Sequence, residues 1–228
     1  MATSATSPAD LEFFFDPVCP FAWITSRWVK EVATQRPLDV RWRFISLAIL
    51  NRDTDYSTFP PTYPDLHRLG TRLLRVAAAA RRSVDASGGD GNEAVDRLYT
   101  AAGERLHNGG VSFAVFGGVP LPAGIVDDII AAAGLDASLV AAADDDSFDE
   151  VLAVETELAL SRAGRDVGTP ILTFSPGGDD ECSLFGPVIS SIPRGAKAVE
   201  LWDAVETLAR TPGFAEFKRS LRDDLSFD

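Results

Sequence analysis

The alternation of apolar and polar positions predicts a strand–helix–strand unit at the start of the chain. Residues 11–15 form an almost continuous apolar run, which is typical of a buried central strand. Residues 20–35 have the spacing of an amphipathic helix, and residues 39–46 alternate in the manner of a strand. Because a helix joins the two strands, we expect them to be parallel, with a right-handed crossover.

Helical spacing dominates the middle of the chain. We expect helices over 64–84, 92–107, 122–133, 136–143 and 147–163. The segment 109–120 is apolar and bounded by glycines, and we expect it to be a connector that packs over a site.

Strand pattern returns near the C-terminus. Residues 169–174 and 181–185 flank the turn-forming run Ser-Pro-Gly-Gly-Asp-Asp, which predicts a hairpin. A helix is expected over 196–210 and a further short helix over 213–222. The order β-α-β, helical block, β-β-α is that of an α/β thioredoxin-like fold with a large helical insertion.

The domain boundaries follow from this order. We assign residues 11–51 and 165–222 to the thioredoxin-like domain and residues 64–164 to an inserted helical subdomain. Residues 1–10 are expected to be a disordered lead-in, and they lack the basic and apolar regions of a signal peptide.

Composition narrows the classes of function. The formal net charge is −13, so phosphate backbones and anionic membrane surfaces are poor partners. No apolar stretch approaches the ~20 residues of a membrane span, and we expect a cytoplasmic protein. The two histidines are far apart in sequence, which argues against a histidine-based metal site. No dinucleotide or phosphate-binding fingerprint is present. We therefore expect no metal and no tightly bound cofactor, with electrons arriving as thiols.

The candidate nucleophile is Cys19, at the predicted start of the helix after the first strand. A helix N-terminus stabilises a thiolate, so we expect a lowered pKa and an accessible sulfur. The alternative is a buried structural cysteine. The run Cys19-Pro20-Phe21-Ala22 is a Cys-x-x-Cys motif whose second cysteine is replaced, which leaves Cys19 without a resolving thiol. Cys182, in the second strand of the late hairpin, is expected to be a packed or edge cysteine.

Several separated stretches resemble one known group of proteins. They are Phe15–Pro20, Trp23–Trp28, Ser46–Asn51, Leu98–Thr100, His107–Asn108, Asp166–Pro170, Phe185–Val188, Ile192–Gly195 and Leu201–Ala204. Together they are similar to the DsbA-like branch of the thioredoxin superfamily and, more narrowly, to the mycothiol-dependent nitroreductase family. That family usually carries Cys-Pro-Trp-Cys, where this chain has Phe21 and Ala22.

The resemblance implies a cytosolic thiol–disulfide oxidoreductase that uses mycothiol as co-substrate and reduces disulfides or nitroaromatic compounds. It also implies a cis peptide bond between Thr169 and Pro170, opposite Cys19, with Thr169 offering backbone groups to the substrate. Phe21, Asn51 and Tyr63 would contact an aromatic substrate.

The leading hypothesis is monothiol exchange at Cys19, with Pro20 in the first helical turn and mycothiol as the external partner. The alternatives are a thiol-dependent transferase or isomerase of the kappa-class glutathione transferase type, and a non-catalytic binding protein. His107 either lines the pocket or caps a helix, the cap being slightly favoured. A homodimer through the insertion is an open expectation.

Overall fold

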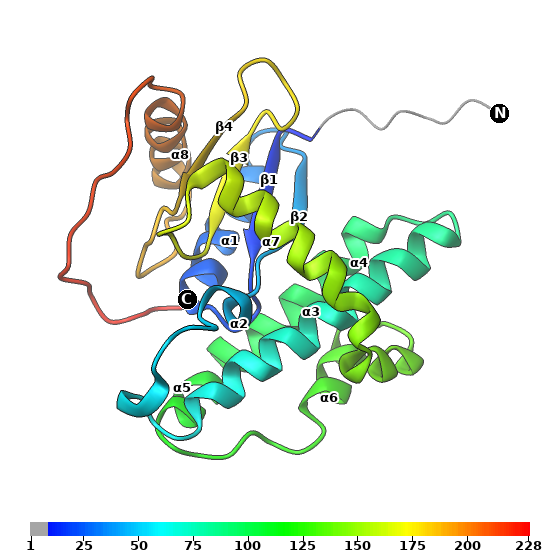
Figure 1. Ribbon diagram of the computed structural model, residues 1–228. Coiled ribbons are helices and arrows are strands. Elements are labelled where there is room, and N and C mark those ends of the chain that lie inside the picture. The colour runs from blue at the N-terminus through cyan, green and yellow to red at the C-terminus, as the bar shows by residue number, and fades with distance from the viewer. Residues whose placement is uncertain (1–8) are drawn as a thin grey trace.

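The computed structural model describes residues 9–228, and within them four strands form one sheet (Figure 1). The strands are β1 (Leu11–Phe15), β2 (Val40–Phe44), β3 (Ile171–Phe174) and β4 (Cys182–Phe185), in the spatial order β2-β1-β3-β4. β1 and β2 are parallel, as predicted, whereas β3 is antiparallel to both β1 and β4. The sheet and its connections form the expected thioredoxin-like fold.

The alternating side chains of β1 define the two faces of the sheet. Phe13 and Phe15 point into the larger core, which includes the apolar side of α1 (Pro20–Ala33). Phe14 points to the other face, where it packs in a cluster with Ala159 of α7 (Asp149–Ala163). Figure 1 shows α7 in front of the sheet and α1 behind it. α8 (Ala196–Ala209) packs on α1, and Trp28 Nε1 donates to the carbonyl of Ala198 at 2.9 Å.

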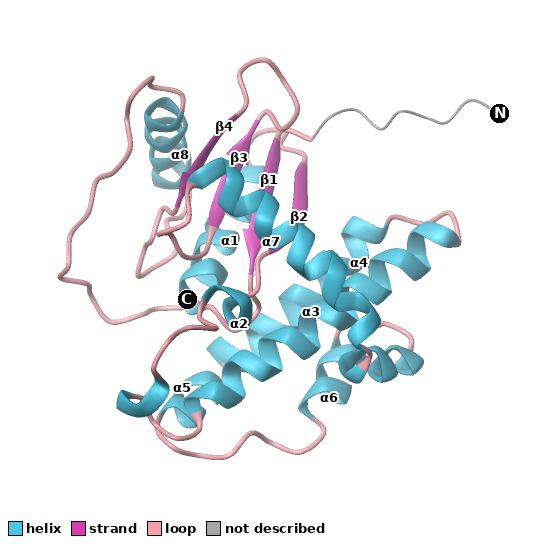
Figure 2. Ribbon diagram, in the orientation of Figure 1, coloured by secondary structure: helices cyan, strands magenta, loops and turns pink. Residues whose placement is uncertain are grey.

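The chain between β2 and β3 consists of helices joined by loops. After the single turn α2 (Leu47–Leu50) it forms α3 (Tyr63–Ala86), α4 (Gly91–Gly103), a π-helical turn (Glu104–Asn108), α5 (Val111–Phe116) and α6 (Ile125–Ala132). 3₁₀ segments at Tyr56–Thr58, Ala137–Asp144 and Asp146–Phe148 complete the helical elements of this region. Figure 2 shows α3 to α6 gathered beyond one end of the strands.

Buried ion pairs join α7 of this helical block to the sheet. Glu155 of α7 accepts the N–H of Phe44 at 2.7 Å and pairs with Arg81 of α3 at 2.7 Å. Arg162 of α7 pairs with Glu12 of β1 at 2.6 Å. The division into two domains at the predicted boundaries remains a prediction.

Four local predictions were wrong. The connector 109–120 contains the helix α5, and the expected helix 136–143 is a 3₁₀ segment. Residues 213–222 form no helix, and Phe217 and Leu221 are 81% and 86% exposed, so packing on the rest of the protein does little to stabilise one here. Disorder at the start is contradicted for Asp10, whose N–H donates to the carbonyl of Asp39 at 3.0 Å. The same expectation for residues 1–8 lies outside the described residues.

No helix in residues 9–228 combines the length and the apolar character that crossing a bilayer requires.

Candidate active site

Cys19 is the N-cap residue of α1, as predicted, with an extended backbone (φ −82°, ψ 112°). Its Sγ accepts the N–H of Ala22 at 3.5 Å, which satisfies one of the unpaired donors of the first helical turn. The thiol in turn donates to the carbonyl of Thr169 at 3.6 Å. The sulfur therefore lies between a helix end and the segment that leads into β3.

The peptide bond between Thr169 and Pro170 is cis, which confirms the expectation. The hydroxyl of Thr169 donates to the carbonyl of Phe14 at 3.1 Å, and the carbonyl of Pro170 accepts the N–H of Gly186 at 2.9 Å. These bonds fix the segment on both sides, so the Thr169 carbonyl is held at Cys19 by the sheet itself.

The pKa of the Cys19 thiol is raised, whereas the sequence predicted that it would be lowered. Burial raises the pKa of its thiol to about 12, while the N–H groups of Ala22 and Phe21 lower it and the Asp16 carboxylate raises it. The predicted lowering by the helix end is wrong here because the side chain is only 7% exposed. Cys19 is also less accessible than predicted. In this arrangement the residue is a neutral thiol.

Asp16 is a buried carboxyl group beside this thiol that sequence reasoning missed. Its two carboxylate oxygens accept the N–H groups of Val18, at 3.1 Å, and Leu47, at 2.8 Å. Burial raises the pKa of Asp16 to about 6, against the effect of those two hydrogen bonds. Asp16 thus ties the loop before Cys19 to α2. The sequence signal that could have indicated Asp16 is a polar residue directly after a buried strand.

His107 supports the same loop from the π-helical turn. Its ring is buried and its Nε2 lies 2.9 Å from the carbonyl of Pro17, which requires that Nε2 carry the proton and donate. Burial lowers the pKa of His107 to about 4, so the ring is neutral. Next to it, the side-chain oxygen of Asn108 accepts Trp23 Nε1–H at 2.9 Å. His107 therefore positions the Cys19 loop, a role that differs from the two predicted ones of lining the pocket and capping a helix.

Pro20 and Phe21 occupy the first turn of α1, and both are half-buried. The Arg222 guanidinium lies 4.9 Å from the centre of the Phe21 ring. The C-terminal segment therefore reaches the first turn of α1, which nothing in the sequence indicated.

Tyr63 begins α3 and belongs to an aromatic cluster on the helical block. Its ring stacks on Phe59 at 4.7 Å and meets Phe116 of α5 edge-on at 5.5 Å. Burial raises the pKa of Tyr63, and the neighbouring Tyr56 phenol raises it further. The contact of Tyr63 with an aromatic substrate stays a prediction.

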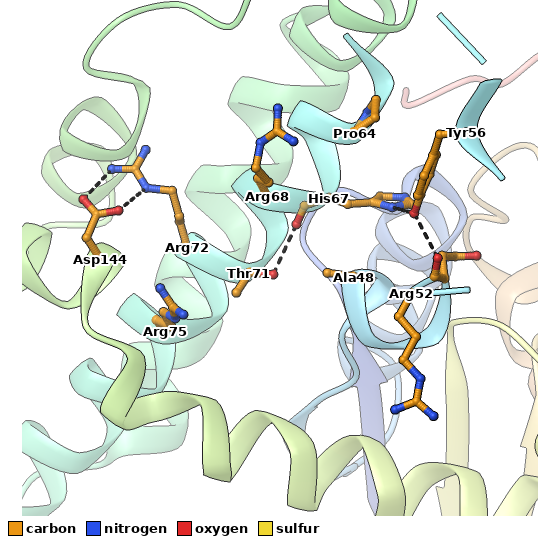
Figure 3. A pocket seen from close by; sticks show the side chains of 11 residues that line it. Ala48, Arg52, Tyr56, Pro64, His67, Arg68, Thr71, Arg72, Arg75 and Asp144 are labelled. Atoms are coloured by element: carbon orange, nitrogen blue, oxygen red, sulfur yellow. Dashed lines mark hydrogen bonds and ion pairs between the residues drawn. The ribbon is translucent and has the colours of Figure 1, made fainter. Parts of the chain in front are cut away.

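Asn51 lines a cavity to which Cys19 does not contribute. It follows α2, its amide donates to the carbonyl of Leu47 at 2.9 Å, and it lines a separate cavity of about 460 Å³. Figure 3 shows this cavity between α2 and α3. It is also lined by Tyr56, His67, four arginines and Asp144, among others, but by neither Cys19 nor Tyr63. The contact of Asn51 with a substrate stays a prediction.

Cys182 is too far away to pair with Cys19. It lies opposite Phe174, which lies opposite Leu11 at the beginning of β1, whereas Cys19 follows the end of β1. Four residue steps of strand separate these levels, or ~13 Å at about 3.3 Å per residue. Disulfides require Cα atoms within about 7 Å. Cys19 therefore has no internal partner, in agreement with the prediction.

No group of three or more histidine, cysteine, aspartate or glutamate side chains is placed to hold a metal ion in the part of the chain that the structure describes.

The uncharacterized protein Rv2286c of Mycobacterium tuberculosis is 31% identical over 221 residues, covering 92% of this chain and 81% of that protein. DsbL of Salmonella enterica serovar Typhimurium is 17% identical with a TM-score of 0.47, covering 91% of this chain and 93% of DsbL. A 2-hydroxychromene-2-carboxylate isomerase is 17% identical with a TM-score of 0.43, covering 86% of this chain and 94% of the isomerase.

A family model described as "Rv2466c-like: Mycothiol-dependent nitroreductase Rv2466c" matches residues 18–219. The match includes Cys19, the whole helical block and the cis-Pro170 segment. The protein therefore belongs to the Rv2466c-like family, whose description names a mycothiol-dependent nitroreductase.

Proposed function

We propose that this protein is a monothiol thiol–disulfide oxidoreductase, in which Cys19 exchanges with small-molecule disulfides and mycothiol regenerates it. The observation that carries the proposal is the position of Cys19 Sγ, between the Ala22 N–H and the Thr169 carbonyl that precedes cis-Pro170. The family description, which names mycothiol, supports the choice of external thiol. Such a thiol pool belongs to a reducing compartment, so the cytoplasm is the expected location.

The exchange proceeds in two balanced steps. The Cys19 thiolate first attacks one sulfur of the disulfide, the S–S bond breaks, and the other sulfur leaves as a thiolate. A mixed disulfide now joins Cys19 to half of the substrate. A mycothiol thiolate then attacks the substrate sulfur and releases Cys19. One disulfide is consumed and one is formed, and the proton lost by mycothiol ends on the departing thiol.

The surrounding residues have distinct roles in this proposal. The N–H groups of Phe21 and Ala22 stabilise the thiolate, because both lower the pKa of Cys19. Backbone groups of Thr169 and Pro170 align the substrate, and Pro20 starts the helix whose end faces the sulfur. The rings of Phe21 and Tyr63 would form apolar walls.

Asn51 has a different part in this scheme. It would contact a portion of the substrate that extends into the separate cavity between α2 and α3. The substrate would then span the distance between that cavity and Cys19.

Turnover of a small disulfide by mycothiol tests the proposal. We expect Cys19→Ser to reduce the rate to that of the uncatalysed exchange, because the hydroxyl group cannot form the mixed disulfide. Cys182→Ser is the matched control and should retain the rate, since Cys182 lies at the other end of the sheet. Unchanged turnover in Cys19→Ser would reject the proposal. The same assay with a nitroaromatic acceptor tests whether nitro compounds also take electrons from this site.

A further inference from the structure

The C-terminal segment takes an unusual course after α8. Residues 214–228 form neither helix nor strand, and Figure 1 shows them looping away from α8 and returning to end close to α1. Phe217 and Leu221 are 81% and 86% exposed, so the middle of the segment lies away from the protein body. We call residues 212–228 the C-terminal strap.

The end of the strap contacts both sides of the Cys19 region. On the side of the thioredoxin-like fold, the N–H of Ser226 donates to the carbonyl of Ser190 at 2.8 Å. On the side of the helical block, the side-chain amide of Asn108 donates to the carbonyl of Phe227 at 3.1 Å. Two consecutive strap residues therefore bridge the two parts of the molecule between which Cys19 lies.

Side chains complete this attachment. The Phe227 ring lies 5.8 Å from the His107 ring and 5.9 Å from the Phe113 ring, within the range of aromatic contacts. Leu225 and Phe227 pack against the main hydrophobic core, a large cluster of which Cys19 is one member. Upstream, the Arg222 guanidinium covers one side of the Phe21 ring, two residues after Cys19.

We propose that residues 222–228 are a closed cover over Cys19, and that the thiol reacts with external molecules only when the strap detaches. The proposal deepens the proposed function and rests on it, because it names how access to that site is controlled. Within residues 9–228, the contacts that hold the strap are few: two hydrogen bonds, one cation–π contact and the packing of two apolar side chains. Segments with so few buried contacts open locally without unfolding of the whole protein. Opening would also return Cys19 to water and remove the burial that now keeps it a thiol.

The rate at which iodoacetamide alkylates Cys19 tests the cover. Intact mass follows the reaction in a Cys182→Ser background, so that one thiol is counted. Because the closed form protects Cys19, weakening the strap should raise the rate in proportion to the open population, by roughly tenfold for Phe227→Ala. Truncation after Thr211 should raise it at least as much. Phe217→Ala is the matched control, the same change at an exposed strap residue, and should leave the rate unchanged.

Each outcome decides the proposal. Equal rates in the full chain, in Phe227→Ala and in the truncated chain overturn it, as does an increase for Phe217→Ala equal to that for Phe227→Ala. If the truncated chain fails to fold, Phe227→Ala decides alone, with a thermal unfolding midpoint to show that the variant is folded.

The labelling assay needs no mycothiol, so the two proposals fail separately. Fast labelling of Phe227→Ala without any mycothiol adduct would leave the cover standing and reject the exchange reaction. A mycothiol adduct, together with a labelling rate that strap variants do not change, would support the exchange reaction and reject the cover.

Discussion

At the scale of single residues, the helix end and burial have opposite effects on the pKa of the Cys19 thiol. The N–H groups of Phe21 and Ala22 favour the Cys19 thiolate, but burial outweighs them, and the Asp16 carboxylate adds to the effect of burial. A helix end contributes up to about 2 kcal/mol, whereas full burial shifts a pKa by as much as 3–5 units, or roughly 4–7 kcal/mol. The sequence predicted the helix end because capping is local. It could not predict burial, which comes from segments distant in the chain.

Asp16 should make stability depend on pH in a defined direction. Burial raises its pKa from 3.8 to about 6, so the folded state holds the proton more tightly than the unfolded state. The resulting stabilisation is complete below about pH 4 and is lost as the pH rises through about 6, a change on the order of 3 kcal/mol. The free energy of unfolding of the wild type, minus that of Asp16→Asn, should therefore fall between pH 4 and 7 in denaturant titrations. Asp53→Asn, at a carboxylate whose side chain is 92% exposed, is the control, and a difference independent of pH would contradict the assignment.

Ala22 should accept a second cysteine. Cys19 Sγ already accepts the N–H of residue 22 at 3.5 Å, which is the geometry of a helix-start Cys-x-x-Cys pair. We expect oxidised Ala22→Cys to lose both thiols and two hydrogens in intact mass, and reduction to restore them. The double variant Cys19→Ser, Ala22→Cys is the control and should keep both of its thiols, the new one and that of Cys182. Three free thiols after mild oxidation of the single variant, Cys182 included, would contradict the backbone described here.

At the scale of elements, the site depends on how closely α4 approaches α1. A methyl group on Gly103 would lie 2.1 Å from the Trp23 ring, closer than real contacts allow. Directly after Gly103 the helix widens into the π-helical turn that carries His107 and Asn108 to the Cys19 loop. Apolar spacing predicted a single helix over this region. It could not reveal the π turn, because the turn adds one residue to the helix without changing its composition.

Gly103→Ala should destabilise the protein. Alanine ordinarily stabilises a helix interior by about 0.5–1 kcal/mol over glycine, so a loss of stability is a specific sign of the contact with Trp23. We expect a loss of about 1–3 kcal/mol in denaturant unfolding, the usual cost of overpacking. Adding Trp23→Leu should recover part of that loss, because the two side chains are coupled. A variant as stable as the wild type would show that the helices are not held this closely.

At the scale of the whole molecule, four distant segments meet at one end of α1. These are the loop 16–19, the Thr169–Pro170 segment, the π-helical turn and the C-terminal strap. The order of elements predicted the fold, and the motif together with the family resemblance predicted Cys19 and the cis bond at Pro170. The bonds of His107 to Pro17 and of Asn108 to Phe227 span 90 and 119 residues. No local periodicity encodes such pairs. The sequence therefore predicted neither the role of His107 in holding the Cys19 loop nor the course of the C-terminal strap.

The capture of mycothiol on Cys19 tests the central claim most directly. The protein, in a Cys182→Ser background, is incubated with the disulfide of mycothiol, and its intact mass is recorded before and after addition of free thiol. We predict one mycothiol per chain, attached to Cys19, absent in Cys19→Ser and released by the added thiol. A folded protein with the strap truncated that binds mycothiol without forming this adduct would contradict exchange chemistry at Cys19 and favour a binding or transferase role.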